Sequence, residues 1–344
     1  MKHLLVLGAL SLFTAVNAAS AQTLTSLDIR TYAGLTITGA VTTVYSIQYV
    51  PDLALTNNAS AWRCLEFLQL PSSPYLPYLW ADRSTPATGK RFYRAVQFEA
   101  STNMVFIPPG TFRMGSPSNE VDRSFWEGPQ PDVTITRGFW MGKYEVTQGE
   151  YLALMGKNPS YFNTNYGFGL DLTRPVESVG RNDATNYCAL LTRKELAAGA
   201  IPQGTEYRLP TSAEWEYACR AWTSTRFSYG DDPSYQDLAN YAWYSVNAQN
   251  KTHPVGQKLP NQWGLYDMAG NVLEYCADDF NQGGLPGGIL IDPVWPDSQF
   301  PIVRGGAFNT PGSPCRSAYF TSSDSLSYGH FMIGFRIVLA VSEH

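Results

Sequence analysis

Histidine is almost missing from this chain of 344 residues, which contains only 4. Beyond the N-terminal leader, these are His253, His330 and the terminal His344. A Ser-His-Asp hydrolase would need His253 or His330, yet no G-x-S-x-G elbow is present. The H-E-x-x-H and C-x-x-C spacings of common zinc sites are also missing. The sequence therefore excludes these zinc sites and gives a histidine hydrolase no support. We expect His253, in THPVG, to be a turn residue bonded to backbone.

Charge is scarce as well, since charged residues make up 15% of the chain and the formal net charge is -5. No basic run exceeds two residues, so neither nucleic acid nor an anionic membrane surface is an indicated partner. Beyond the leader, no apolar run approaches the ~18 residues that a spanning helix needs. We therefore expect no membrane span.

The first 21 residues are typical of a secretory signal peptide. Lys2 and His3 precede an apolar run from Leu4 to Val16, and small residues follow up to Ala21. We expect cleavage near Ala21 and a mature chain that is secreted or periplasmic.

Residues 22–99 alternate β-branched or aromatic residues with polar ones in TLTSLDIRTY, GLTITG, TVYSIQYV and KRFYRAVQF. They predict a small, all-β, sandwich-like module. This module has one cysteine, Cys64, and no histidine, which favours an adhesive or spacing role over catalysis. Glu99 to Met104 is the expected linker.

From Val105 the pattern changes to short elements between long irregular stretches rich in aromatic residues. FIPPGTFRMGS predicts a strand, a turn and a strand. Helices are predicted over Glu145–Met155, with Thr147 as N-cap and Glu150 completing a capping box, over Asp183–Lys194, and over Ala213–Arg220 with Thr211 or Ser212 as cap. Strands are expected around IVRGGAF and GFRIVLAV. Long loops in a compact domain usually carry function or bind ions.

The stretch Asn261–Tyr275, NQWGLYDMAGNVLEY, fits neither a helical nor a strand period, and Gly270-Asn271 indicates a tight turn. Asp267, the backbone around Gly270, and Glu274 could face one hard cation, because calcium prefers oxygen ligands on a bent backbone. Chemistry alone equally permits a buried turn in which Glu274 binds backbone amides.

The chain has five cysteines, Cys64, Cys188, Cys219, Cys276 and Cys315. An odd number in an exported protein implies at least one free thiol. No cysteine has a histidine within three positions that could activate it. Cys188 lies on the apolar face of a predicted helix, which favours a buried and inert thiol.

Several motifs taken together resemble the formylglycine-generating enzyme (sulfatase-modifying factor) family. FIPPGTFRMGS, YEVTQGEY, DATNYC, RLPTSAEWEYACR, GLYDMAGNVLEY, VRGGAF, CRSA and GFRIV occur in that family's order, over roughly residues 105–341. The resemblance implies an irregular, loop-rich α+β fold related to C-type lectins.

The resemblance also implies metal sites and a disulfide. One structural calcium ion would be held by Asp267, Glu274 and the carbonyls of Gly270 and Val272, and a second by Asn240 and Tyr241. The family's further Asp of the second site has no match near Ser245–Asn250. A disulfide between Cys219 and Cys315 is implied. The family's other bridge, from the Cys188 position, cannot form because Ile337 replaces its partner.

Catalytic members of the family oxidise a sulfatase cysteine with oxygen and a copper(I) ion held by two thiolates. In this chain, Ala307 replaces the serine of their GGS motif, Thr310 the first thiol, and Leu273 a nearby tryptophan. Cys315 falls at the second thiol by counting, although its CRSA context matches the structural cysteine. With at most one thiol, copper is not expected.

We therefore favour a binding or scaffold module, for an unknown protein, peptide or carbohydrate ligand, over two alternatives. One is an enzyme of this fold with a different site. The other is the family oxidase with a rearranged pair such as Cys276 and Cys315.

Overall fold

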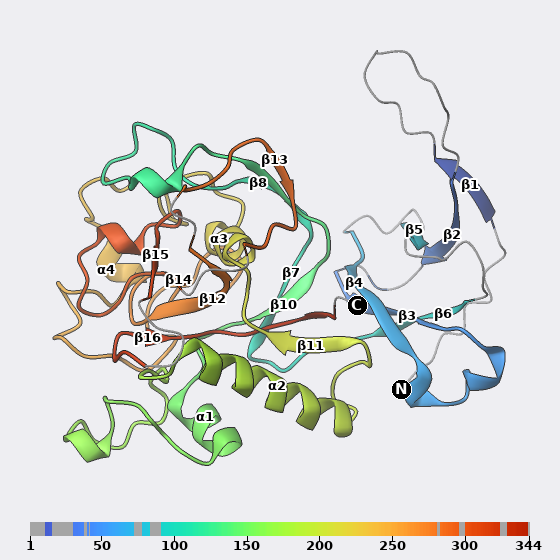
Figure 1. Cartoon of the computed structure of the whole chain (residues 1–344), viewed down its shortest axis with the longest axis horizontal. Coiled ribbons are helices and arrows are strands. Elements are labelled where there is room, and N and C mark those ends of the chain that lie inside the picture. Colours follow the sequence, from blue (N-terminus) through green and yellow to red (C-terminus); the bar gives the residue numbers. More distant parts are fainter. Residues whose placement is uncertain are drawn as a thin grey trace. The chain divides into compact units, whose positions relative to one another are not determined.

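The computed structural model describes residues 11–15, 30–37, 40, 42–71, 78–82, 91–280, 283–295, 300–323 and 329–342. The chain divides into two compact units (Figure 1). The first comprises Met1–Glu99 with Pro202–Gly204, and the second Ala100–Ile201 with Thr205–His344. Among the described residues, no helix has the length and apolar character needed to cross a membrane.

The first unit contains two three-stranded sheets, in the orders β1-β2-β5 and β4-β3-β6. One apolar cluster takes residues from both, among them Ile37, Ile47 and Trp80. The predicted strands at 43–50 and 90–98 are confirmed, whereas most of the predicted signal peptide lies outside the described residues, apart from β1. The strands are β1 (Ser11–Ala15), β2 (Arg30–Ile37), β3 (Val44–Val50), β4 (Arg63–Gln69), β5 (Tyr78–Asp82) and β6 (Phe92–Gln97), with 3₁₀ turns η1 (Leu53–Leu55) and η2 (Ala59–Ala61).

The second unit mixes short strands with four helices among its described residues and is the irregular α+β fold that the sequence predicts. Its sheets have the orders β11-β17-β10-β7, β15-β14-β12-β16 and β13-β9-β8. The strands are β7 (Met104–Ile107), β8 (Gly110–Arg113), β9 (Asp132–Ile135), β10 (Phe139–Gly142), β11 (Thr205–Arg208), β12 (Leu273–Asp279), β13 (Ile289–Ile291), β14 (Pro301–Arg304), β15 (Phe320–Ser322), β16 (Ile333–Gly334) and β17 (Val338–Val341). The helices are α1 (Gln148–Met155), α2 (Arg181–Ala197), α3 (Ser212–Arg220) and α4 (Leu238–Tyr241), with 3₁₀ turns η3 (Phe125–Glu127), η4 (Thr164–Tyr166) and η5 (Ser313–Cys315).

Local capping sets where the helices begin. Thr147 caps α1 and Thr211 caps α3, each with a glutamate three residues on that completes a capping box. The prediction placed Glu145 inside α1, but the helix starts at Gln148, and Glu145 lies before the cap, where its side chain turns into the core. Helix α4 was not predicted, because its four residues are too few for a periodic pattern.

Helix α3 is the centre of the second unit, and all nine of its residues are buried (Figure 1). Trp215, fully buried, belongs to the core cluster and donates its indole N–H to Glu274 on β12 at 2.7 Å. Three arginines without solvent exposure join distant segments through carboxylates, in the pairs Arg304–Glu216, Arg316–Glu127 and Arg336–Glu274. Each of these three arginines therefore has a carboxylate partner, as a buried cation in a low-dielectric interior requires.

Candidate functional site

The stretch 261–275 contains the tight turn that the sequence predicts at Gly270-Asn271, and its last three residues belong to β12. Asp267, Gly270 and Asn271 all have positive φ, between 55° and 79°. A Cβ on Gly270 would lie 2.2 Å from the carbonyl oxygen of Trp243, so only glycine fits there. The Asn261 carboxamide oxygen accepts from the amides of Trp263 and Leu265 and fixes the start of the turn.

Beneath this turn lies a cluster of three buried carboxylates, from Glu145, Asp267 and Glu274, with one arginine. Arg336 donates two hydrogen bonds to Glu274, at 2.6 Å each. Glu274 was expected to bind backbone amides if the turn held no metal ion. That expectation is wrong, because Arg336 and the Trp215 indole occupy its oxygens. The backbone role belongs to Glu145, which accepts from the Val272 amide at 3.1 Å and from the Asn271 side chain at 2.7 Å.

Asp267 is the one member of the cluster with an unused oxygen. Its Oδ2 accepts from the Gly256 amide at 2.6 Å, whereas its buried Oδ1 has no hydrogen-bond partner among the described residues. Burial raises the pKa of Asp267 to about 6, with a smaller contribution from Glu274, against the lowering effect of the Gly256 amide and Arg336. Burial, followed by Asp267 and Glu274, also raises the pKa of Glu145 well above its ordinary value. If all three carboxyls were ionised, Arg336 alone would not balance their charge, and burial with mutual repulsion therefore favours the protonated forms of Glu145 and Asp267.

The residues predicted for a second metal ion, Asn240 and Tyr241, lie on α4. The Asn240 carbonyl accepts from the Leu259 amide, and the Tyr241 ring stacks on Tyr229 with centroids 4.1 Å apart. Within the ranges given above, no three His, Cys, Asp or Glu side chains form a metal-binding group. The sites predicted from the sequence rely partly on carbonyls, so calcium at either place stays a prediction.

The loop at 305–310, where the family's catalytic members read GGS and a cysteine, is closed on itself. The Thr310 hydroxyl accepts from the Ala307 amide at 2.9 Å and donates to the Ala307 carbonyl at 3.0 Å. The side chains of Ala307 and Phe308 have no solvent exposure. This loop therefore presents a threonine engaged in a local turn where a thiol would be needed.

Cys315 is buried directly behind this loop, and a Cβ on Gly306 would lie 2.7 Å from its sulfur. Burial raises the pKa of the Cys315 thiol to about 12, so the thiol is protonated at neutral pH. The four cysteines of the second unit, Cys315 included, are all buried and outside any disulfide. Cys188 is therefore a buried free thiol, as predicted.

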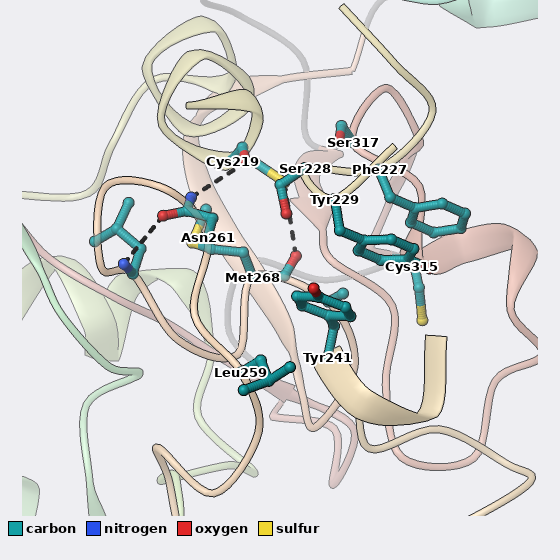
Figure 2. Close-up of a pocket in the computed structure, with 12 residues that line it drawn as sticks. Cys219, Phe227, Ser228, Tyr229, Tyr241, Leu259, Asn261, Met268, Cys315 and Ser317 are labelled. Atoms are coloured by element: carbon teal, nitrogen blue, oxygen red, sulfur yellow. Dashed lines mark hydrogen bonds between the residues drawn. The ribbon is translucent and has the colours of Figure 1, made fainter. Parts of the chain in front are cut away.

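The structure does not contain the disulfide predicted between Cys219 and Cys315. Both residues line one small pocket, but their sulfurs do not point toward each other (Figure 2). The Cys219 sulfur lies 3.9 Å from the Met268 carbonyl oxygen and the Cys315 sulfur 4.0 Å from that of Pro311. Pairing would require at least one side chain to rotate.

The bridge stays a prediction for the exported protein. Closing a loop of roughly a hundred residues would stabilise the fold by about 4–5 kcal/mol in the chain-entropy model, less any strain. Peptide mapping without reduction should recover the two cysteines in one linked fragment. Recovery of either as a free thiol from oxidatively exported protein would contradict the prediction.

Next to the closed loop lies a group of rings that the sequence did not single out. Phe308 packs edge-on against Phe162, with centroids 5.0 Å apart, and lies 6.1 Å from Phe331. Tyr161 packs against Phe162 and Phe331, and Tyr166, which is 59% exposed, packs in turn against Tyr161. We call this the aromatic cluster: Tyr161, Phe162, Tyr166, Phe168, Phe308 and Phe331. The only sequence signal was the long, aromatic-rich segment between α1 and α2.

The fold agrees with the comparison to known families. Residues 91–341 match the sulfatase-modifying factor enzyme 1-like domain, and the chain belongs to that family. The match begins somewhat before residue 105, the start expected from the motifs.

Relatives of this chain have different names. It is 29% identical over 272 residues to "Chaperone protein LppX" of Paenibacillus barcinonensis, covering 67% of this chain and 86% of the relative. It is 26% identical over 277 residues to a formylglycine-generating enzyme of Thermomonospora curvata, covering 63% and 86%.

Solved structures give the same fold. Treponema denticola variable protein 1 has a TM-score of 0.59 at 26% identity, covering 70% of this chain and 95% of that one. PvdO from Pseudomonas aeruginosa has a TM-score of 0.58 at 31% identity, covering 69% and 94%.

Proposed function

We propose that this protein is an exported polypeptide-binding module of its family that lacks the copper-dependent oxidase activity. The loop at 305–310 carries the proposal. Thr310 and Ala307 bond to each other where a thiol would stand, and Phe308 joins the loop to the aromatic cluster. Cys315, the thiol directly behind the loop, and Cys219, which lines the same small pocket, are both buried and protonated at neutral pH. Soft Cu(I) needs thiolates, so these surroundings suit an apolar contact instead.

The aromatic cluster is the surface that we assign to binding. Tyr161, Tyr166 and Phe331 are each more than a third exposed, and Leu170, two residues beyond Phe168, is 77% exposed. Exposed aromatic side chains near one another are typical of interaction sites. The rings meet edge-on or tilted, so that both ring edges and ring faces are offered to apolar side chains of a peptide. A relative named as a chaperone supports a polypeptide partner in preference to a carbohydrate.

Suppression of client aggregation tests this assignment. Light scattering of thermally unfolding citrate synthase should fall when the protein is added in equimolar amount. The triple variant Tyr166→Ser, Phe168→Ser, Leu170→Ser should lose several-fold in this effect, because its apolar contact surface is gone. Val246→Ser is the matched control, since Val246 is 76% exposed on a different loop. Equal protection by both variants, or binding to a glycan array with no client protection, would contradict the proposal.

We also propose that calcium binds at the 261–275 turn through Asp267 and Glu274 with the carbonyls of Gly270 and Val272. The orphaned Oδ1 of Asp267 supports this, as does the excess of buried carboxylate over Arg336. Glu274 would share its oxygens between Arg336 and the ion. Calcium supplies the positive charge that the cluster lacks.

Stability should therefore depend on both pH and calcium. The folded pKa of Asp267, about 6, is above its ordinary value near 3.8. Its contribution is therefore fully present below pH ~4 and is lost as the pH rises through ~6. Without calcium, the Asp267 carboxyl should make the protein melt at a higher temperature at pH 5 than at pH 7.5. Excess calcium should raise the melting temperature at pH 7.5, because the ion binds the folded chain by mass action.

Two matched variants separate calcium from titration. Asp267→Asn should abolish the calcium response and flatten the pH dependence. Asp278 has a pKa also raised to about 6 by burial, but its two oxygens accept from the Ser212 and Trp295 amides, away from the turn. Asp278→Asn should therefore change the pH dependence and keep the calcium response. Identical wild-type melting with EDTA and with calcium would show that no ion binds at the turn.

A further inference from the structure

A cavity of about 590 Å³ opens in the second unit, lined by α1, α2 and residues just before β7 and after β10. Its volume is in the range of small-molecule sites. None of residues 305–315 and no member of the aromatic cluster lines it. This cavity is therefore separate from the surface assigned to polypeptide binding, and a ligand in it would be independent of that assignment.

A tyrosine hydroxyl of the cavity lining has no hydrogen-bond partner among the described residues. Tyr187 lines the cavity and is only 4% exposed as a residue, yet its hydroxyl makes no hydrogen bond to any described residue. The Tyr144 hydroxyl, also in the lining, is likewise without a partner among the described residues. Two hydroxyls are thus available to a ligand.

The charge around the cavity is negative. Glu150 and Glu195 line it from α1 and α2, and neither forms an ion pair with a residue that the structure describes. Each carboxylate has one oxygen engaged, Glu150 with the Thr147 cap and Glu195 with the Tyr207 hydroxyl at 3.3 Å, which leaves the other available. The third acid of the lining, Glu145, has both oxygens engaged by Asn271 and Val272, and Lys194 is the one cation of the lining.

Apolar side chains complete the lining, including Leu154, Leu172, Val255 and Ile337. A ligand that satisfies such a site has an apolar body and a cationic group. Its N–H groups would pair with the carboxylates and donate to the tyrosine hydroxyls, and tyrosine rings attract cations through their faces. We propose that this cavity binds a small organic amine with an apolar body.

Three compounds of similar shape but different charge test the proposal by calorimetric titration of the full chain. 3-Phenylpropylamine should bind saturably, about tenfold or more tighter than 3-phenylpropanol, and 3-phenylpropionate weakest of the three. Glu150→Gln with Glu195→Gln should weaken amine binding about tenfold and leave the alcohol unchanged. Glutamine at position 150 preserves the capping box, so α1 should persist.

A steric variant locates the binding. Ala153 lines the mouth on the exposed side of α1, and Ala153→Trp should abolish amine binding. Ala197→Trp is the matched control, because Ala197 is exposed on α2 but lies outside the lining. Equal affinity for the amine and the propionate, no saturable amine binding, or amine binding that survives Ala153→Trp would each overturn the proposal.

Discussion

A sulfatase-type cysteine peptide should remain unmodified after aerobic incubation with the purified protein and copper. Turnover in the family requires two thiolates that hold Cu(I) and place the substrate sulfur beside oxygen. Here Thr310 bonds to Ala307 in a closed turn, and the thiol directly behind that turn, Cys315, is buried against Gly306. A lone, protonated thiol leaves soft Cu(I) under-coordinated.

Mass spectrometry of the peptide is the measurement, since conversion of the thiol to an aldehyde lowers its mass. The formylglycine-generating enzyme of Thermomonospora curvata serves as the positive control. Ala307→Ser with Thr310→Cys should not restore activity, because the Cys315 sulfur faces the Pro311 carbonyl inside the core. A displacement of the reacting groups by even ~1 Å can lower the catalytic rate about a hundredfold. Copper-dependent turnover by the unmodified protein would contradict the binding-module proposal and support the alternative that the protein is the family oxidase.

The sequence alone predicts those features that depend only on residues a few positions apart. Thr147 and Thr211 cap α1 and α3 because hydroxyl and glutamate lie three residues apart, a spacing that needs no tertiary partner. The Gly270-Asn271 turn was readable for the same reason, since both residues adopt positive φ readily.

The carboxylate cluster could be predicted only in part. Asp267 and Glu274 share one short stretch, so their proximity followed from spacing. Glu145 lies 127 positions before Val272 and accepts a hydrogen bond from its amide. In the sequence, Glu145 precedes a capping threonine by two positions and was therefore included in the predicted helix. Nothing periodic marks such a contact, because it depends on how two distant segments fold together. Arg336 lies between β16 and β17 within the apolar run GFRIV, and a charged residue in such a run indicates a buried partner.

The exposure of the rings in the aromatic cluster could not be predicted from the sequence. Sequence composition identified long loops rich in tyrosine and phenylalanine, but the same rings suit a core or a surface. Phe162 and Phe308 are buried while Tyr166 is 59% exposed, although all belong to one cluster. Exposure is set by packing against the 305–310 loop and Phe331, which only the three-dimensional arrangement reveals.

The largest loss of stability is expected from Arg336→Leu. Arg336 has no solvent exposure, binds Glu274 through two hydrogen bonds, and donates to the carbonyls of Gly142 and Tyr266 at 3.0 Å each. Its removal leaves Glu274 unpaired beside Glu145 and Asp267, so three carboxylates would share an interior without a cation. Breaking a buried pair from one side typically costs about 3–5 kcal/mol.

Urea unfolding at pH 7.5 measures this loss, with Arg113→Leu as the control. Arg113 pairs with Asp132 at 3.6 Å, but both side chains are more than half exposed, so its loss should be below ~1 kcal/mol. Arg336→Lys should be intermediate, because it keeps the charge and loses the paired donors. Acidification to pH 5 should recover part of the Arg336→Leu loss, since the raised pKa values of Glu145 and Asp267 allow these carboxyls to protonate. Equal unfolding midpoints for Arg336→Leu and Arg113→Leu would show that the cluster does not depend on its arginine.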